Sequence, residues 1–292
     1  MATCLVCGSD NLKAFYNGPI RMGSFGKVSD KQADITECAN CGARHLPPVM
    51  EDIEAYYRTG EYRADLDQGN AVEKYFQLTD NEQTEKLDIL GLHHFRGKVV
   101  ADIGAGAGPF LDLVKGVAAR TIAVEPNENY HASLRERGHE VFPSTVACAS
   151  AWGGRLDAAV SFSVVEHVEK PREFLAEIKT LLKPGARLVV STPNANDYLL
   201  ELCPAYQAFF YRKVHLWYFH ADSFRKLAEL AGFSSCAIHY RHRFDLSNSL
   251  IWLRDRRPSG LGAIKLDPAV DAVWKQHLET SGRSDYFYAV LA

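Results

Sequence analysis

The sequence has no strong excess of charge, no long apolar run and no N-terminal signal segment. Its 33 Lys and Arg against 36 Asp and Glu leave a formal net charge of −3, so we expect no overall attraction to nucleic acid or to an anionic membrane. No apolar run approaches the roughly 18–20 residues that cross a bilayer. Repeats and low-complexity tracts are missing too. We therefore expect a cytoplasmic protein with no membrane partner.

The chain has 292 residues, 47% of them apolar and 24% charged, which suits one large α/β domain with an appendage. From Lys98 onward, short apolar runs alternate with helical patterns, which predicts a parallel, doubly wound sheet. We expect seven strands, mostly parallel, in a Rossmann-like arrangement, at 98–103, 121–124, 140–142, 156–162, 187–192, 235–240 and 285–291. The predicted division is a small module over 1–50, a linker or helical cover over 51–81, and the main domain over 82–292. Insertions are expected at about 196–218 and 241–284.

Four of the seven cysteines form two C-x-x-C-G turns, at Cys4 and Cys7 and at Cys38 and Cys41. Such turns direct two thiolates at one ion, and two turns make a tetrahedral four-sulfur site suited to Zn²⁺. Iron–sulfur, disulfide and free-thiol states are the alternatives. With four protein ligands the ion has no open position, so we expect a structural zinc in a zinc-ribbon-like module rather than a catalytic metal.

A glycine-rich turn follows the first predicted strand of the main domain, in the segment VVADIGAGAGPF. Glycines let a ligand approach the backbone and allow positive φ angles. The dinucleotide fingerprint GxGxxG would need a third glycine at 109 or 111, where the chain has Pro109 and Leu111. The spacing is instead D-x-G-x-G-x-G from Asp102. Glu125, at the end of the next strand, is placed to accept the hydroxyls of a ribose.

This loop resembles the first motif of class I S-adenosylmethionine (SAM)-dependent methyltransferases, and the stretch from Leu156 to Asn194, with its EHV and KPG segments, is similar to a later unit of the same family. Ala186 departs from the second glycine of the usual PGG turn. The resemblance implies a SAM-binding fold in which the Asp102 loop holds the methionine part and Glu125 the ribose. Implied cofactor-binding residues are Asp102, Gly104, Ala105, Gly106, Glu125, Pro126, Phe162 and Ser163, with Ser144, Thr145 and Val146 as candidates for the adenine contact.

Methyl transfer to a hydroxyl needs an aligned nucleophile and a base, and a histidine is the usual base. His167 follows the fourth strand, where substrate meets cofactor in this fold, and a structural role in its loop is the alternative. His215, Tyr218 and His220 form a second candidate cluster, with aromatic packing and a helix cap near His220 as the alternative. In the predicted linker, we expect Tyr56, Tyr57, Tyr62 and Arg63 either to line a substrate groove or to pack between the N-terminal module and the main domain.

The four-cysteine module, the tyrosine-rich linker and the segment FDLSNSLIWLRDRRPSG look like those of bacterial methyltransferases of polysaccharide or deoxysugar biosynthesis. We therefore expect a small-molecule acceptor, a sugar or nucleotide-sugar, methylated on oxygen or else on carbon or nitrogen. Polar and aromatic residues predicted around the cleft suit a sugar: Asn194, Asn196, Tyr198, Tyr206, Tyr211 and Trp217. A zinc-knuckle RNA methyltransferase is the second hypothesis, against which the acidic balance counts. A non-catalytic, zinc-bearing assembly module is the third.

Overall fold

The computed structural model describes residues 3–23, 27–48, 52–65 and 68–292. Its main element is a seven-stranded sheet with the strand order β10-β11-β8-β7-β4-β5-β6. The five strands from β8 to β6 are parallel, and β11 is antiparallel to both of its neighbours, β8 and β10. The strands are β4 (Val99–Ile103), β5 (Arg120–Val124), β6 (Glu140–Phe142), β7 (Leu156–Phe162), β8 (Leu182–Pro193), β10 (Cys236–Arg241) and β11 (Tyr286–Leu291). The predicted mostly parallel, Rossmann-like sheet is confirmed.

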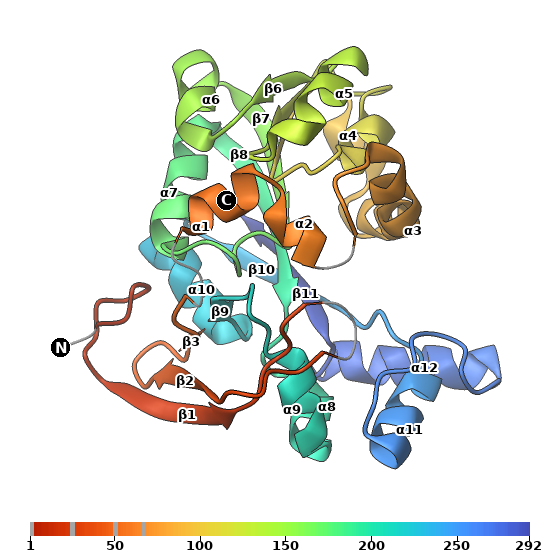
Figure 1. Cartoon of the computed structure of the whole chain (residues 1–292). Helices are drawn as coiled ribbons and strands as arrows, with labels where there is room; N and C mark the ends of the chain where they lie inside the picture. Colours follow the sequence, from red (N-terminus) through yellow and green to blue (C-terminus); the bar gives the residue numbers. More distant parts are fainter. Residues whose placement is uncertain (1–2, 24–26, 49–51, 66–67) are drawn as a thin grey trace.

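Helices cover both faces of this sheet, as expected from strands that are apolar on both sides (Figure 1). One layer contains α3 (Val72–Leu90), α4 (Pro109–Val114) and α5 (His131–Glu136). The other contains α6 (Thr145–Trp152), α7 (Pro171–Leu181) and α10 (Ala221–Leu230). Proline occupies the first turn of α4 and of α7, where the missing N–H costs nothing. The apolar cores on the two faces are separate clusters.

A second, four-stranded sheet forms the N-terminal part, in the order β1-β2-β3-β9. Its first three strands are β1 (Leu12–Gly18), β2 (Ala33–Cys38) and β3 (Arg44–His45). The fourth, β9 (Trp217–Tyr218), comes from the predicted insertion at 196–218 and pairs antiparallel with β3. The N-terminal module is therefore joined to the main domain by strand pairing. The predicted boundary between residues 50 and 51 lies outside the described residues.

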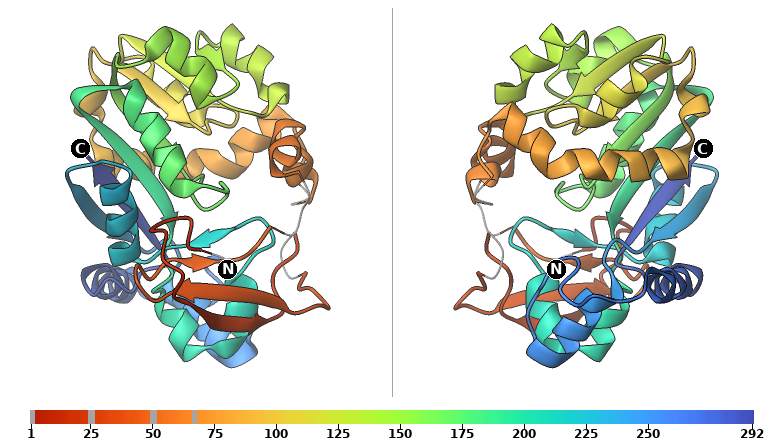
Figure 2. Two further views of the ribbon diagram at one scale, coloured as in Figure 1. Left: turned by 90° about the vertical axis from the view of Figure 1, so that its left-hand side faces the viewer. Right: turned by 90° about the vertical axis from the view of Figure 1, so that its right-hand side faces the viewer.

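The segment between the two sheets forms α1 (Ile53–Arg58) and α2 (Glu61–Asp65), which lie between the α/β part and the N-terminal sheet (Figure 2). The first predicted insertion also contains α8 (Tyr198–Leu202) and α9 (Pro204–Phe210), and the second contains α11 (Leu246–Asp255) and α12 (Pro268–Thr280). Buried side chains of these helices share an apolar cluster with the N-terminal sheet. Within the described ranges, no helix is both long enough and apolar enough to cross a bilayer.

Candidate cofactor and acceptor site

A cavity of about 530 Å³ opens at the carboxyl ends of β4, β5 and β7, the edge at which ligands bind in doubly wound sheets. Its volume lies in the range of small-molecule sites. The predicted site residues that line it are Asp102, Gly104, Ala105, Gly106, Glu125, Pro126, Ser144, Thr145, Phe162, Ser163, His167 and His215. Val146 does not line it: this side chain is 70% exposed on α6. The candidate adenine contacts are therefore reduced to Ser144 and Thr145.

The glycine loop after β4 adopts the positive φ angles that its glycines predict. Gly104 and Gly106 have φ angles of 82° and 56°, which side-chain-bearing residues rarely adopt. A Cβ atom on Gly106 would also come within 2.1 Å of the Tyr75 hydroxyl oxygen. The loop therefore leaves no room for a side chain at Gly106, and α3 contributes Tyr75 to the same wall.

Two buried carboxylates flank this loop. Glu125 accepts hydrogen bonds from the backbone N–H groups of Gly106 at 2.6 Å and Asn127 at 2.8 Å. Asp102 has no hydrogen-bond partner among the described residues, although it is only 4% exposed. Burial raises the pKa of Asp102 to about 7, with Glu125 raising it further and Lys86 opposing the shift. The Gly106 N–H is thus hydrogen-bonded to Glu125. The Asp102 carboxylate remains available to accept a hydrogen bond from an amine of a ligand.

His167 lies at the other end of the cavity, where its ring makes hydrogen bonds through Nδ1. Its Nδ1 is 2.7 Å from the backbone oxygen of Val214 and 2.8 Å from the hydroxyl of Tyr57. Because a carbonyl oxygen only accepts, the ring proton sits on Nδ1 and Nε2 keeps its lone pair. Burial lowers the pKa of His167 to about 3, and Arg212 adds to the effect. The imidazole is therefore neutral at physiological pH.

Glu166 and His215 complete a cluster with His167. A ligand atom from each of the three lies within 4.8 Å of the others, and the two imidazole rings meet edge to face at 4.7 Å. Glu166 is 1% exposed, and neither of its carboxylate oxygens has a hydrogen-bond partner in the described part of the chain. Burial raises its pKa to about 7. One carboxylate and two imidazoles can move a proton, and the same donor set suits a transition-metal cation.

His220 is not part of this cluster and does not line the cavity. Its Nδ1 accepts from the N–H of Ser223, and its own N–H donates to the Ser223 hydroxyl, so His220 caps α10. Its Nε2 faces the N-terminal module, 2.5 Å from where a Cβ on Gly42 would be. The predicted catalytic role of His220 therefore has no support in its position, and the helix-cap alternative describes what the residue does.

The polar and aromatic residues expected around the cleft are mostly core residues. Asn194 is 0% exposed and its side-chain amide donates to the backbone oxygens of Gly282 and Ser284. The remaining ones, Asn196, Tyr198, Tyr206, Tyr211 and Trp217, also lie outside the cavity wall. Of the tyrosine-rich linker, Tyr57, Tyr62 and Arg63 do line the cavity, whereas Tyr56 is buried and donates to Asp65. The linker thus contributes two tyrosines and an arginine to the cavity wall.

Several cavity residues were not predicted from the sequence. Lys86 of α3 has its amine 4.7 Å from the centre of the Phe162 ring. Tyr286 of β11 contacts the Ser163 hydroxyl. Arg212, Arg243 and Glu166 line the acceptor end. Of these residues, only Glu166 belongs to a sequence motif, the EHV segment, that could have indicated a place in the site. The others come from segments that fold back onto the sheet edge, and no local pattern marks them.

The four cysteines of the two C-x-x-C turns come together at the N-terminal end of the chain. All four sulfurs lie within 4.8 Å of one another, with Cys4 to Cys41 at 3.7 Å and Cys7 to Cys38 at 3.5 Å. Disulfide sulfurs are about 2.0 Å apart, so these thiols are not bonded to each other. Zn–S bonds of about 2.3 Å in a tetrahedron put the sulfurs about 3.8 Å apart. The donor set and spacing fit a zinc ion.

Comparison with known proteins gives the family. The profile described as "Methyltransferase domain" matches residues 77–237, more than half of the chain. The chain belongs to this methyltransferase family. Its domain is that of a SAM-dependent methyltransferase, as the glycine loop and Glu125 predicted.

Curated relatives of the methyltransferase differ in their named reactions. This chain is 27% identical over 164 residues to a ubiquinone biosynthesis O-methyltransferase of Dinoroseobacter shibae, and the match covers 50% of this chain and 63% of the relative. It is 24% identical over 251 residues to the C-methyltransferase NovU of Streptomyces niveus, covering 81% and 57%. The matches span between 40% and 63% of the length of such relatives.

Solved structures support the fold of the methyltransferase. A SAM-dependent methyltransferase from Archaeoglobus fulgidus has a TM-score of 0.52 at 20% identity, covering 75% of this chain and 96% of that one. The SAM complex of Haemonchus contortus phosphoethanolamine N-methyltransferase 2 has a TM-score of 0.55 at 16% identity, covering 85% and 62%.

Proposed function

We propose that the methyltransferase transfers a methyl group from SAM to a hydroxyl of a sugar or nucleotide-sugar, with His167 as the base. The observation that carries the proposal is the fixed ring of His167, whose Nδ1 is held by Val214 while Nε2 is left to accept a proton. The resemblance of the linker and the C-terminal insertion to sugar-modifying enzymes supports the acceptor class. The tyrosines and arginines of the cavity wall support a polar acceptor.

SAM, when bound, supplies a methyl group on a positively charged sulfur. Asp102 would bind its amino group, because this carboxylate lines the cavity and has no partner among the residues that the structure describes. Glu125 holds the ribose hydroxyls through the lone pairs that its two backbone hydrogen bonds leave free. Ser144 and Thr145, which line the cavity, would contact the adenine, and Phe162 and Ser163 would lie beside the reacting centre.

His167 takes the proton of the acceptor hydroxyl on Nε2 as the new carbon–oxygen bond forms and the bond between the methyl carbon and the sulfur breaks, with S-adenosylhomocysteine as the leaving group. An oxygen that gains a methyl group becomes a strong acid, so an imidazole with a lowered pKa is basic enough. Glu166, with a carboxylate oxygen within 4.8 Å of a ring nitrogen of His167, would stabilise the protonated imidazole by its negative charge. The tyrosine wall of α1 and α2 orients the acceptor and keeps water from the reacting atoms.

The four-cysteine cluster holds a structural zinc ion in this proposal. Two sulfur pairs at 3.5 and 3.7 Å and the absence of disulfides support it. The ion would fix the fold of the N-terminal sheet, which is paired to the main domain through β9. It would play no part in the chemistry, because all four of its coordination positions are taken by the chain.

The test is an assay of S-adenosylhomocysteine release by the full chain with a panel of nucleotide-sugars and free sugars, with mass spectrometry of the products to locate the methyl group. His167→Asn should lower turnover at least tenfold and leave S-adenosylhomocysteine binding unchanged. His277→Asn, on the exposed surface of α12, is the matched control.

Retained turnover in His167→Asn would refute the base, and methyl groups found only on carbon would refute O-methylation. The cluster of Glu166, His167 and His215 also has the donor set of a cation site. Added Mg²⁺, Mn²⁺ or Zn²⁺ should therefore leave the rate unchanged if His167 is the base. A cation-dependent rate would reassign these three residues as ligands.

A further inference from the structure

Arg212 lies at the acceptor end of the cavity. It belongs to the same short segment as Val214, whose backbone oxygen is hydrogen-bonded to His167. The Arg212 backbone is fixed on both sides: its N–H donates to the Tyr218 hydroxyl at 2.8 Å, and its carbonyl accepts from the N–H of His215 at 3.1 Å. The next residue but one, Val214, is the partner of His167 Nδ1. Arg212 and the proposed base are therefore positioned by the same few residues.

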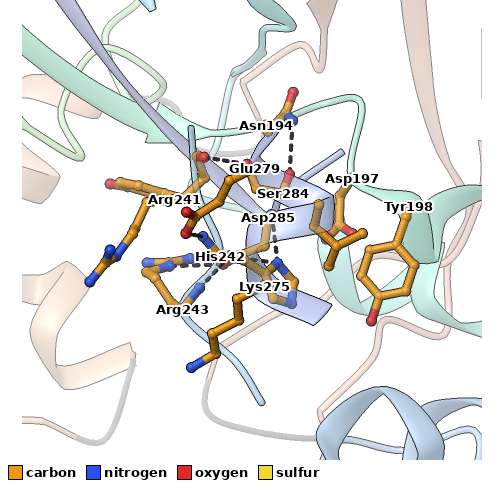
Figure 3. Close-up of polar contacts among 12 residues, drawn as sticks. Asn194, Asp197, Tyr198, Arg241, His242, Arg243, Lys275, Glu279, Ser284 and Asp285 are labelled. Carbon is orange, nitrogen blue, oxygen red and sulfur yellow. Dashed lines mark hydrogen bonds and ion pairs between the residues drawn. The ribbon is translucent and has the colours of Figure 1, made fainter. Parts of the chain in front are cut away.

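Arg243, the other arginine at this end, is already neutralised within the protein. Its Nε donates to the Asp285 carboxylate at 2.8 Å, and its backbone N–H donates to the same carboxylate at 2.9 Å (Figure 3). Its guanidinium lies 3.9 Å from the centre of the Tyr286 ring. Asp285 is 4% exposed. Nearby, Lys213 is likewise paired with Asp65 at 2.9 Å. These two cations bring little net charge into the cavity.

Arg212 has no such partner. Among the described residues, no carboxylate lies within 4.0 Å of its guanidinium nitrogens, and Glu166 acts on it only from farther away. A second cation, Arg21 of the N-terminal part, lies beside it, because the backbones of the two residues form a parallel bridge. Burial and the charge of Arg212 lower the pKa of Arg21 to about 9. Neither arginine has an acid partner in the described ranges, so the pair leaves uncompensated positive charge in a poorly solvated place.

We propose that Arg212 binds an anionic group of the acceptor, a phosphate or a carboxylate, with Arg21 strengthening the positive field behind it. The guanidinium offers a planar fork of donors that matches either oxyanion in two parallel hydrogen bonds. Its backbone is held before the ligand arrives, which lowers the ordering cost of binding. The inference rests on the proposed function, since it places the anion on the molecule whose hydroxyl faces His167.

The test measures anion binding without methyl transfer. The full chain, saturated with S-adenosylhomocysteine, is titrated calorimetrically at low ionic strength with inorganic pyrophosphate, with malonate and with uncharged methyl glucoside. We expect about one pyrophosphate or malonate per chain, with the stronger of the two naming the oxyanion. Arg212→Gln should weaken that binding at least tenfold, and Arg212→Lys, which keeps the charge but not the fork, should weaken it less.

Arg225→Gln is the matched control, because it removes the same charge from the exposed surface of α10. It should bind the anion as the unchanged chain does. S-adenosylhomocysteine affinity, measured on every variant, should stay within twofold and so excludes a folding defect. The inference is overturned if neither anion binds, or if Arg212→Gln binds as tightly as the unchanged chain. Anion binding without methylation of any sugar would instead count against the proposed function alone.

Discussion

Replacing Asp102 by asparagine should stabilise the ligand-free methyltransferase while destroying its affinity for SAM. Asp102 is buried, lacks a hydrogen-bond partner among the described residues and has a pKa raised from 3.8 to about 7. When folding raises the pKa of a carboxyl group, the folded state loses stability as the pH rises from the pKa of the unfolded chain to that of the folded chain. Asparagine has nearly the same shape and carries no charge, so it removes this penalty.

The penalty follows from the two pKa values. Ionising a group whose pKa rises from 3.8 to about 7 on folding costs at most about 4 kcal/mol above pH 7, and about 1.5 kcal/mol at pH 5. The pKa of about 7 already includes the opposing charge of Lys86, but water in the open cavity recovers part of this cost. We therefore expect Asp102→Asn to raise the free energy of unfolding by about 1–3 kcal/mol at pH 8 and by less at pH 5.

Denaturant unfolding at pH 5 and pH 8, without ligand, measures this difference. Asp88→Asn, at an exposed position of α3, is the control and should change little at either pH. SAM binding, measured by calorimetry at pH 8, should weaken at least tenfold in Asp102→Asn, because the ligand amine loses its ionic partner. In the unchanged chain it should weaken below about pH 7 as Asp102 takes up a proton. A variant that is less stable at pH 8, or that binds SAM normally, would show that Asp102 is structural.

Three further predictions concern other parts of the chain. Elemental analysis should return about one zinc per chain, and Cys38→Ser should lose the metal and lower the melting temperature; a stable, metal-free protein would contradict this. His220→Ala should cost about 0.5–2 kcal/mol of stability through the lost cap of α10, with turnover unchanged at a temperature where the protein is folded; a loss of turnover there would restore its catalytic role. Gly106→Ala should abolish S-adenosylhomocysteine binding, because its Cβ would collide with Tyr75; normal binding in calorimetry would show that the loop adapts.

The sheet and the cofactor end were predictable because their signals are local. Each strand and helix of the main domain has its own apolar pattern, and the observed bounds of β7 match the prediction residue for residue. Asp102 and Glu125 end neighbouring parallel strands, so their meeting at one edge follows from the topology. β8 begins at Leu182, five residues before its predicted start, because Leu182 already pairs with Leu156 of β7 ahead of a register shift, after which the pairing resumes at Arg187.

The acceptor end was not predictable in the same way. Arg212 and Arg243 reach the cavity only because two insertions fold back onto the sheet, and no local spacing marks such a return. Asn194 and the tyrosines of the first insertion were misread because polar and aromatic residues suit a sugar cleft and a well-bonded core equally well. For His220 the sequence left a catalytic role and a helix cap open, because the same side chain can serve either, and the structure shows the cap.

The pairing of β3 with β9 has a consequence for how the chain folds. The two strands are separated by more than 170 residues of sequence, from Arg44–His45 to Trp217–Tyr218. The cofactor end is built from strands that follow one another, so its contacts form at a small entropic cost. The acceptor wall needs the linker and both insertions together. During synthesis we therefore expect the chain to acquire a place for its cofactor well before it can recognise an acceptor.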